Sequence, residues 1–295
     1  MTVDLKSTLN SELFEFMRDK WIPFSRTQSL DFDKVIPTIL SYKKLDLEQV
    51  QHKALPALKG LSLFGLNHLP DMLEFLPDPD NADFPSEALG LQLLLDQAPR
   101  ALLKGIDSRW SHAYFDEISL QYAQRLQTLP AHQKPSSWGR WQGKVSLDYF
   151  VLVRIWFGAP FVHHEKASAQ AVAFTEQTRR LIEDTFKIQD PCRTQPEKRW
   201  DLYGFPRLWK QGGPESPCGV AAGTFWLTHL MDVHKPILDL YGRYPYQNSL
   251  LGRLDTAEEE AWLQKAACFE VDTDARERIR RDVDTGQWTP LKGIM

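Results

Sequence analysis

Apolar residues recur at spacings of three and four along most of the chain, a pattern typical of helices with one buried face. The clearest stripe runs from about residue 108 to 129, and similar stripes cover about residues 9–17, 35–40, 88–95 and 225–234. A further helix is expected after Pro160, along Ala167, Ala171, Phe174 and Thr178. Helices are therefore expected to make up most of the fold.

Loops are predicted where proline, glycine and aspartate accumulate, over about residues 68–86 and 130–143. Residues 189–219 are rich in proline and glycine and are expected to form one long connection, a length typical of a lid, a binding loop or a disordered segment. Near the end of the chain, Thr256 and Glu259 have the spacing of a capping box, which predicts a helix start.

One segment, residues 145–157, fits two kinds of structure. Its apolar residues alternate with period two and include several β-branched side chains, which favours a strand. However, Phe150, Leu152 and Trp156 fill the other face as well, as in a buried helix, and no second segment alternates clearly enough to pair with it. We favour the helix, and therefore predict an all-α layered fold in which residues 1–295 form one domain.

Composition and charge narrow the class of protein. The 295 residues include 35 basic and 39 acidic side chains, so the formal net charge is −4, which argues against a nucleic-acid-binding protein. No apolar run is long enough for a transmembrane helix, and the N-terminus lacks the apolar core of a signal peptide. Three widely spaced cysteines fit a reducing compartment. We expect a cytoplasmic protein that binds neither nucleic acid nor membrane.

The first candidate cluster is the sequence Leu-Asp-Gln-Ala-Pro-Arg at residues 95–100. Asp96 and Arg100 are four residues apart, so on a helix they share a face and are positioned to pair. One interpretation is an exposed ion pair that closes the helix. The other is an arginine that Asp96 holds so that its guanidinium faces an anion, with Gln97 beside it.

Histidines and carboxylates form two further clusters. His163, Glu165 and Gln170 follow Pro160, and His163 is a candidate general base or acid because imidazole titrates near neutrality. His234 lies two residues after Asp232 and is a second acid–base candidate. The alternative is a capped helix start with solvated histidines, and a hydrogen-bonded structural histidine at residue 234. Neither spacing matches a helix-borne metal motif, so no metal site is predicted.

The fourth cluster is a polar, aromatic run from Tyr241 to Arg253. Arg243 and Arg253 flank Asn248 in a segment with few aliphatic residues, and binding residues concentrate on such loops. The structural alternative is a network in which the arginines cap helix ends. Because the Rossmann, Walker and nucleophile-elbow motifs are absent, no nucleotide or other cofactor is predicted.

Taken in order, the four clusters resemble a family described only as domain of unknown function 924. The resemblance rests on residues 95–100, His163 to Glu165 with Gln170, His234, residues 241–248 and the Leu-Gly-Arg at 251–253, and it spans about residues 86–265. It implies a tetratricopeptide-like all-α fold but no established activity. It also implies that the matched residues are functional: Asp96, Gln97, Arg100, His163, Glu165, Gln170, His234, Arg243, Pro245, Asn248 and Arg253.

Departures from the family pattern suggest a specialised ligand. Ala98 stands where the family has phenylalanine, His164 where it has serine, and Lys166 where it has an acidic residue, while Tyr246 and Gln247 replace a histidine–arginine pair. The loss of a histidine and an arginine favours a ligand that is less anionic and more aromatic.

We hypothesise a small-molecule enzyme that uses acid–base chemistry without a redox cofactor, as an isomerase, cyclase, lyase or hydrolase. Its catalytic residues would be His163, Glu165, Asp96 and His234, and its substrate-binding residues Gln97, Arg100, Gln170, Arg243, Asn248 and Arg253. Their chemistry suits an aromatic or carboxylate-bearing substrate. The rival hypothesis is a non-catalytic helical scaffold that binds a peptide or a small ligand in an open groove.

Overall fold

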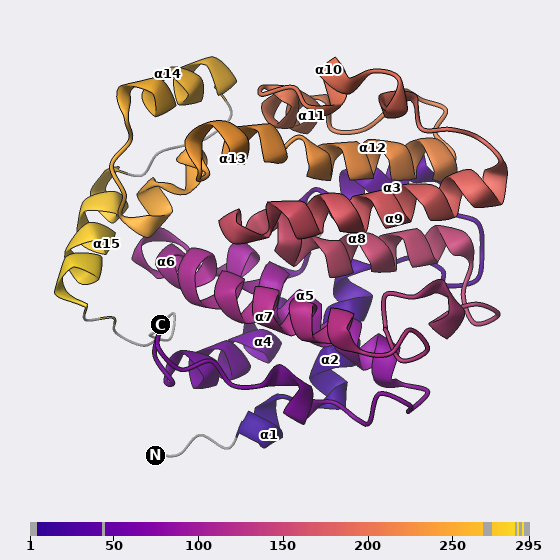
Figure 1. Cartoon of the computed structure of the whole chain (residues 1–295). Helices are drawn as coiled ribbons and strands as arrows, with labels where there is room; N and C mark the ends of the chain where they lie inside the picture. The colour runs from indigo at the N-terminus through magenta and orange to yellow at the C-terminus, as the bar shows by residue number, and fades with distance from the viewer. Residues whose placement is uncertain (1–4, 43–44, 268–272, 287, 289–290, 292–295) are drawn as a thin grey trace.

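The computed structural model describes residues 5–42, 45–267, 273–286, 288 and 291, and over these ranges the protein is all-α, without a β-strand (Figure 1). The prediction of an all-α fold is confirmed. The longer helices are α2 (Ser11–Trp21), α3 (Phe32–Ile39), α4 (Leu47–Ser62), α5 (Phe84–Leu102), α7 (Asp116–Thr128), α8 (Leu147–His163), α9 (Ser168–Phe186), α11 (Gly204–Gln211), α12 (Val220–Asp232), α13 (Lys235–Tyr241), α14 (Ala257–Ala266) and α15 (Thr273–Thr285).

Shorter helices lie before and between these long ones. They are α1 (Leu5–Thr8), α6 (Ser108–Trp110) and α10 (Pro196–Arg199), together with single turns at Met72–Phe75, Gly105–Asp107, Trp138–Arg140, Glu165–Ala167, Pro191–Arg193, Pro245–Gln247 and Ser249–Leu251. None of the helices within the described ranges combines the length and apolarity that a bilayer-spanning segment requires.

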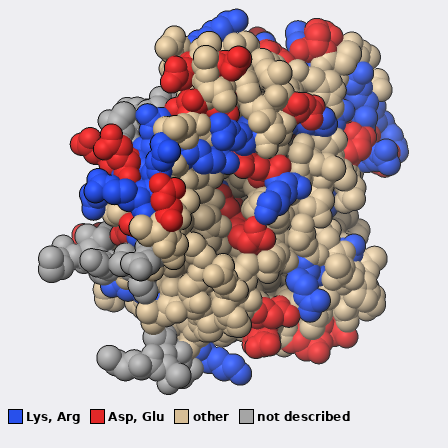
Figure 2. Space-filling view, turned by 60° about the vertical axis from the view of Figure 1, so that its left-hand side comes forward, with Lys and Arg blue, Asp and Glu red and all other residues tan. Residues whose placement is uncertain are grey.

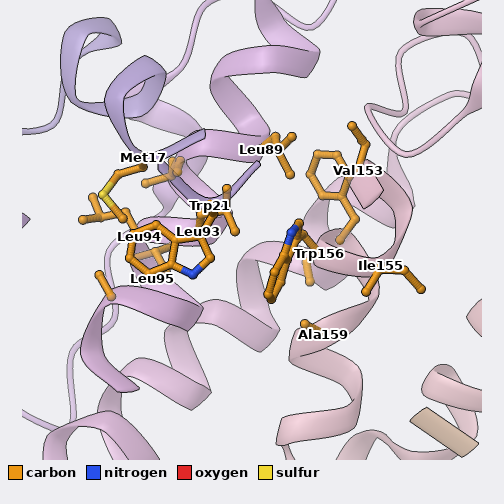
Figure 3. Packing of buried hydrophobic residues seen from close by; sticks show 14 of the residues in the cluster. Met17, Trp21, Leu89, Leu93, Leu94, Leu95, Val153, Ile155, Trp156 and Ala159 are labelled. Carbon is orange, nitrogen blue, oxygen red and sulfur yellow. The ribbon is translucent and has the colours of Figure 1, made fainter. Parts of the chain in front are cut away.

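Helices α5 and α8 form the centre of the molecule. Helix α5 packs against α2, α4, α7 and α8, and helix α8 packs against α5, α7, α9 and α12. Figure 3 shows part of the core in which side chains of α2, α5 and α8 meet, among them Leu93 and Trp156. Since nearly every residue of α5 is buried, its polar residues Asp96 and Gln97 are fixed within the core.

The alternating segment 145–157 is part of helix α8, as we favoured. This helix is apolar on all sides because other helices surround it, and a helix buried all round has no polar face to mark the 3.6-residue period. One charged side chain, Arg154, lies in its buried middle part. Arg154 is buried, and its guanidinium donates to Thr178 Oγ1 and to the Ser136 carbonyl oxygen.

Two predicted boundaries were wrong. Pro160 lies inside α8, which continues to His163, and the next helix, α9, begins only at Ser168. The long connection over residues 189–219 contains helices α10 and α11, and α11 ends where Gly212 adopts a left-handed conformation. Proline and glycine thus mark the ends of short helices here, not one extended loop.

The predicted helix over residues 108–129 is present but irregular. Between α6 and α7 the backbone forms a π-helical turn at Ser111–Phe115, which holds one extra residue compared with an α-helix. Turns of this kind occur frequently at functional sites. His112 lies within it.

A smaller apolar cluster lies beside the main core. It contains Ile237, Leu238, Tyr244, Trp262 and Ala266, from α13, α14 and the segment between them. The predicted capping box at the start of α14 is confirmed, since Thr256 Oγ1 accepts from Glu259 N and Glu259 Oε2 accepts from Thr256 N.

The face of the molecule in Figure 2 carries basic and acidic side chains side by side, without a patch of one sign. This mixture agrees with the small net charge.

Candidate functional site

A cavity of about 500 Å³ lies between the main core and the smaller apolar cluster. Its size falls within the usual range of small-molecule sites. Helices α5, α8, α11 and α12 line it, together with the π-helical turn and the segment around Tyr246. The residues that line it include Tyr42, Gln97, Arg100, Lys104, Ser111, His112, Ile155, Trp156, Ala159, His163, Phe205, Trp209, Leu227, Leu230, Met231, His234, Tyr246, Gln247 and Leu250.

Most of the cavity wall is apolar and aromatic. Phe205 lies with its ring centroid 4.1 Å from that of His234 and 5.5 Å from that of Tyr246. Trp156 contributes from α8 and Trp209 from α11, where it is partly exposed. A ligand with a flat apolar body fits such a wall, because aromatic side chains bury a large apolar area.

His163 and Asp96 form a hydrogen-bonded pair at the cavity wall. His163 is the last residue of α8, and its Nδ1 lies 2.8 Å from Asp96 Oδ1. Asp96 is only 2 % exposed, whereas the His163 side chain is 27 % exposed. A carboxylate can only accept, so Nδ1 carries the hydrogen and donates it. The other ring nitrogen, Nε2, has no hydrogen-bond partner among the described residues and presents a lone pair.

Two neighbours hold Asp96 in place. Gln97 donates from Nε2 to Asp96 Oδ2 at 2.5 Å, and the Tyr42 hydroxyl donates to Gln97 Oε1 at 3.0 Å. Burial raises the pKa of Tyr42 to about 12, so this hydroxyl keeps its proton at neutral pH. The chain Tyr42–Gln97–Asp96 thus orients the carboxylate that orients His163. Gln97 lines the cavity, but its amide is engaged in this chain.

Arg100 pairs with Asp116 of α7, not with Asp96 as the spacing suggested. Asp96 and Arg100 do share a face of α5, but each meets a partner from another helix. Burial raises the pKa of Asp116, but the charge of Arg100, with further effects from His112 and His163, outweighs burial and lowers that pKa to about 2. The Arg100–Asp116 pair is therefore charged at neutral pH, and its two formal charges cancel.

His112 completes this side of the cavity. Arg100 Nη1 lies 3.3 Å from His112 Nδ1, and because a guanidinium can only donate, Nδ1 accepts. Burial lowers the pKa of His112, and the charge of Arg100 adds to this effect. Asp116, whose Oδ2 lies 3.7 Å from His112 Nδ1, acts in the opposite direction but does not outweigh them. His112 is therefore neutral, with its hydrogen on Nε2, and this N–H has no acceptor among the described residues.

His234 reaches the same cavity from the turn between α12 and α13. Its Nδ1 donates to the Leu230 carbonyl oxygen at 2.9 Å. Burial, with a smaller effect from His163, lowers the pKa of His234 to about 3. His234 is therefore neutral and has a lone pair on Nε2. His163 and His234, far apart in the sequence, line one cavity.

Glu165, Arg243, Asn248 and Arg253 do not line this cavity. Arg253 binds Glu165 through two hydrogen bonds of 2.7 and 2.9 Å, and Glu165 also accepts from Tyr244 N. Arg243 binds Glu259 in the same two-point manner, and Asn248 donates to Asp255. The contacts of Glu165 hold this segment against the turn that follows α8, and the other two contacts hold residues 241–259 together. They fit the structural alternative for this cluster better than the substrate-binding one.

Gln170 and Asp232 also lie away from the cavity. Gln170 is exposed on α9, where its Oε1 accepts from Gln124. Asp232 is buried and binds Arg199 and Arg179, so it anchors residues 190–199 against α9 and α12.

No group of three or more histidine, cysteine, aspartate or glutamate side chains within the described ranges is placed to hold a metal ion. Cys192 and Cys218 are free thiols, and burial raises the pKa of each. Cys268 lies outside the described residues.

Three polar residues that shape the site were not expected from the sequence: Tyr42, His112 and Asp116. His112 and Asp116 stand four residues apart on the helix with the clearest apolar stripe, and that spacing was the available signal. The π-helical turn shifts the register at His112, and the stripe does not reveal such a turn.

The chain belongs to a family described as bacterial protein of unknown function (DUF924), whose model matches residues 76–267. The resemblance inferred from the four clusters is thus confirmed, and the match begins about ten residues earlier than expected. No curated protein and no solved structure matches the chain.

Proposed function

We propose that this protein is a small-molecule enzyme that uses acid–base chemistry, with His163 as the general base. The observation that carries the proposal is the Asp96–His163 pair on the wall of an apolar cavity. Asp96 fixes the tautomer of His163 and stabilises the imidazolium that forms when Nε2 accepts a proton.

The proposal covers isomerisation, cyclisation, addition or loss of water, and hydrolysis, because each needs a proton moved at a defined atom. Proton transfer of this kind uses the side chains alone, so the proposal includes no redox cofactor. His234 supplies a second proton acceptor. Its low pKa makes it unsuited to act as an acid at neutral pH, unlike the role that its position in the sequence suggested.

We also propose the finer fold and setting expected from the sequence, a tetratricopeptide-like arrangement in the cytoplasm. Contacts between helices that follow one another, α4 with α5, α7 with α8 and α8 with α9, support the arrangement. The free thiols of Cys192 and Cys218 support a reducing compartment.

An isotope experiment tests the proposal and does not require the substrate to be identified first. The protein is incubated with a bacterial metabolite extract in deuterated, ¹⁸O-labelled water, and mass spectrometry detects metabolites that gain label. Proton transfer at carbon introduces deuterium, and hydrolysis or hydration introduces ¹⁸O. We expect label to depend on the wild-type protein and to fall about 10²-fold or more in His163→Gln and Asp96→Asn.

His132→Gln is the matched control, because His132 is an exposed histidine remote from the cavity lining. It should label as the wild type does. If His163→Gln labels the same metabolites at the same rate as the wild type, His163 is not the base. A ligand that binds without gaining label would instead support the scaffold hypothesis.

A further inference from the structure

The second polar group in the cavity, Arg100 with His112, has no part in the Asp96–His163 pair. We propose that Arg100 and His112 stabilise an oxyanion, and that the substrate is a neutral, mainly apolar carbonyl compound with an acidic C–H beside the carbonyl. This inference rests on the proposed function, because it takes His163 as the base.

The hydrogen-bond donors and acceptors of the cavity are arranged for this chemistry. His112 accepts from Arg100 at Nδ1, so its Nε2–H is left as a donor on a residue that lines the cavity. His163 and His234, by contrast, present lone pairs at Nε2. The cavity therefore has acceptors where a proton leaves and a donor where negative charge develops. A neutral imidazole N–H, kept neutral by positive electrostatic potential nearby, is a known way to polarise a carbonyl.

The two residues that hold His163 and His112 lie close together on α5. Asp96, which holds His163, and Arg100, which holds His112, are four residues apart, or about 6 Å along the helix axis. His163 and His112 are thus anchored to α5 about one helical turn apart. A C–H and the neighbouring carbonyl oxygen, each at about 3 Å from its protein partner, can bridge anchors at this spacing.

The charges of the side chains around the cavity favour a neutral substrate. Asp116 neutralises Arg100, and Asp96 accepts a hydrogen bond from His163. The remaining cation among the lining residues, Lys104, is exposed and donates to the Arg100 carbonyl oxygen. A carboxylate substrate would bring an added negative charge into the apolar part of the cavity, where Asp116 already neutralises Arg100, and this is unfavourable. Lys104 has no carboxylate partner among the described residues, but it is exposed to solvent, so its charge offsets this cost only weakly. A neutral substrate avoids this cost, because proton transfer to His163 creates equal and opposite charges.

The step balances without a further reactant. His163 Nε2 takes the proton from the substrate carbon, and the C–H electron pair forms a carbon–carbon double bond. The carbonyl π electrons move to oxygen, where His112 Nε2–H and Arg100 stabilise the enolate. Transfer of the proton from His163 to a conjugated carbon gives isomerisation. Exchange at the original carbon follows when the imidazolium proton is replaced by one from water before it returns.

4-Nitrophenol tests this arrangement, because a phenolate resembles an enolate and absorbs visible light. We expect the wild type to bind it with the phenol ionising at least tenfold more readily than in water, measured by titrating the phenolate band. His112→Leu removes the donor and should abolish most of this effect, and His112→Gln, which restores an N–H, should recover it. The neutral ether 4-nitroanisole should bind wild type and His112→Leu equally, which also shows that the variant folds.

The inference fails if His112→Leu and wild type ionise the phenol equally, if 4-nitrophenol does not bind at millimolar concentration, or if 4-nitrobenzoate binds more tightly than 4-nitrophenol. Each of these results leaves the isotope experiment on His163 free to succeed. Equal labelling by His163→Gln and wild type would instead overturn the proposed function, whatever the phenol shows.

Discussion

At the scale of single residues, a buried imidazole that stays neutral makes the stability of the fold depend on pH. His234 has a pKa of about 3 in the folded chain, well below the ordinary value of 6.5, chiefly because it is buried. The unfolded chain therefore binds a proton at His234 between pH 6.5 and about 3, and the folded chain does not. This contribution to stability is complete above pH 6.5 and is lost as the pH falls toward 3.

Replacement of this histidine should make the protein less sensitive to acid. His234→Asn keeps a side-chain N–H for the Leu230 carbonyl oxygen but removes the titration. Between pH 7.5 and 5 the wild type should lose about 2 kcal/mol more unfolding free energy than the variant, from about 1.4 kcal/mol per pH unit below 6.5. Urea unfolding at the two pH values measures this. Identical losses in the two proteins would show that His234 is not buried as a neutral group.

At the scale of helices, the close approach of α2 and α5 depends on one glycine. A Cβ atom at Gly90 would lie 2.0 Å from the Phe14 carbonyl oxygen, so the two backbones could not keep this distance. Normally alanine stabilises a helix relative to glycine by about 1 kcal/mol. Here the contact reverses the sign of that effect.

We expect Gly90→Ala to lower the unfolding free energy by about 3 kcal/mol, because a helix at the centre of the core must move. The control is Gly139→Ala, at a site with open space around the added methyl group, which should change stability by less than about 0.5 kcal/mol. Chemical denaturation of both variants checks the prediction, and a Gly90→Ala protein as stable as the wild type would contradict the packing described.

Helices and their ends could be predicted from the sequence where the residues that determine them lie within a few positions of one another. The capping box of Thr256 and Glu259 is confirmed because both partners lie within one turn. Helix α8 was ambiguous because its surroundings, not its own sequence, make it apolar on every side. The partner of Arg100 could not be predicted, since Asp116 comes from another helix and local spacing offered Asp96 instead. The same holds for His163, whose Asp96 lies 67 residues away along the chain.

At the scale of the whole molecule, the cavity joins two apolar clusters of unequal size. Ile155 and Trp156 belong to the main core, and Phe205 and Tyr246 pack against the smaller cluster around Trp262. Few buried contacts hold the smaller cluster, so local opening there needs less free energy than opening of the core. A ligand in the cavity touches both sides and stabilises their contact.

Hydrogen–deuterium exchange should show this difference. Amides of α8 should exchange slowest, and those of α13 and α14 faster. Saturating 4-nitrophenol should slow exchange in α13 and around Tyr246 several-fold, with little change in α2, which does not line the cavity. Uniform exchange across both clusters, or protection by the ligand at α2 alone, would contradict a cavity placed between them.

The π-helical turn at Ser111–Phe115 has a consequence for how this family diversifies. An α-helix advances about 100° per residue, so a turn with one extra residue can be gained or lost by a single-codon insertion or deletion. Loss of that residue would leave α7 and its Asp116 packed in the same position. The residues before α7 would rotate about the helix axis, and another side chain would take the place of His112. A chain that differed by one residue here would then present a different side chain to the cavity although its core stayed the same.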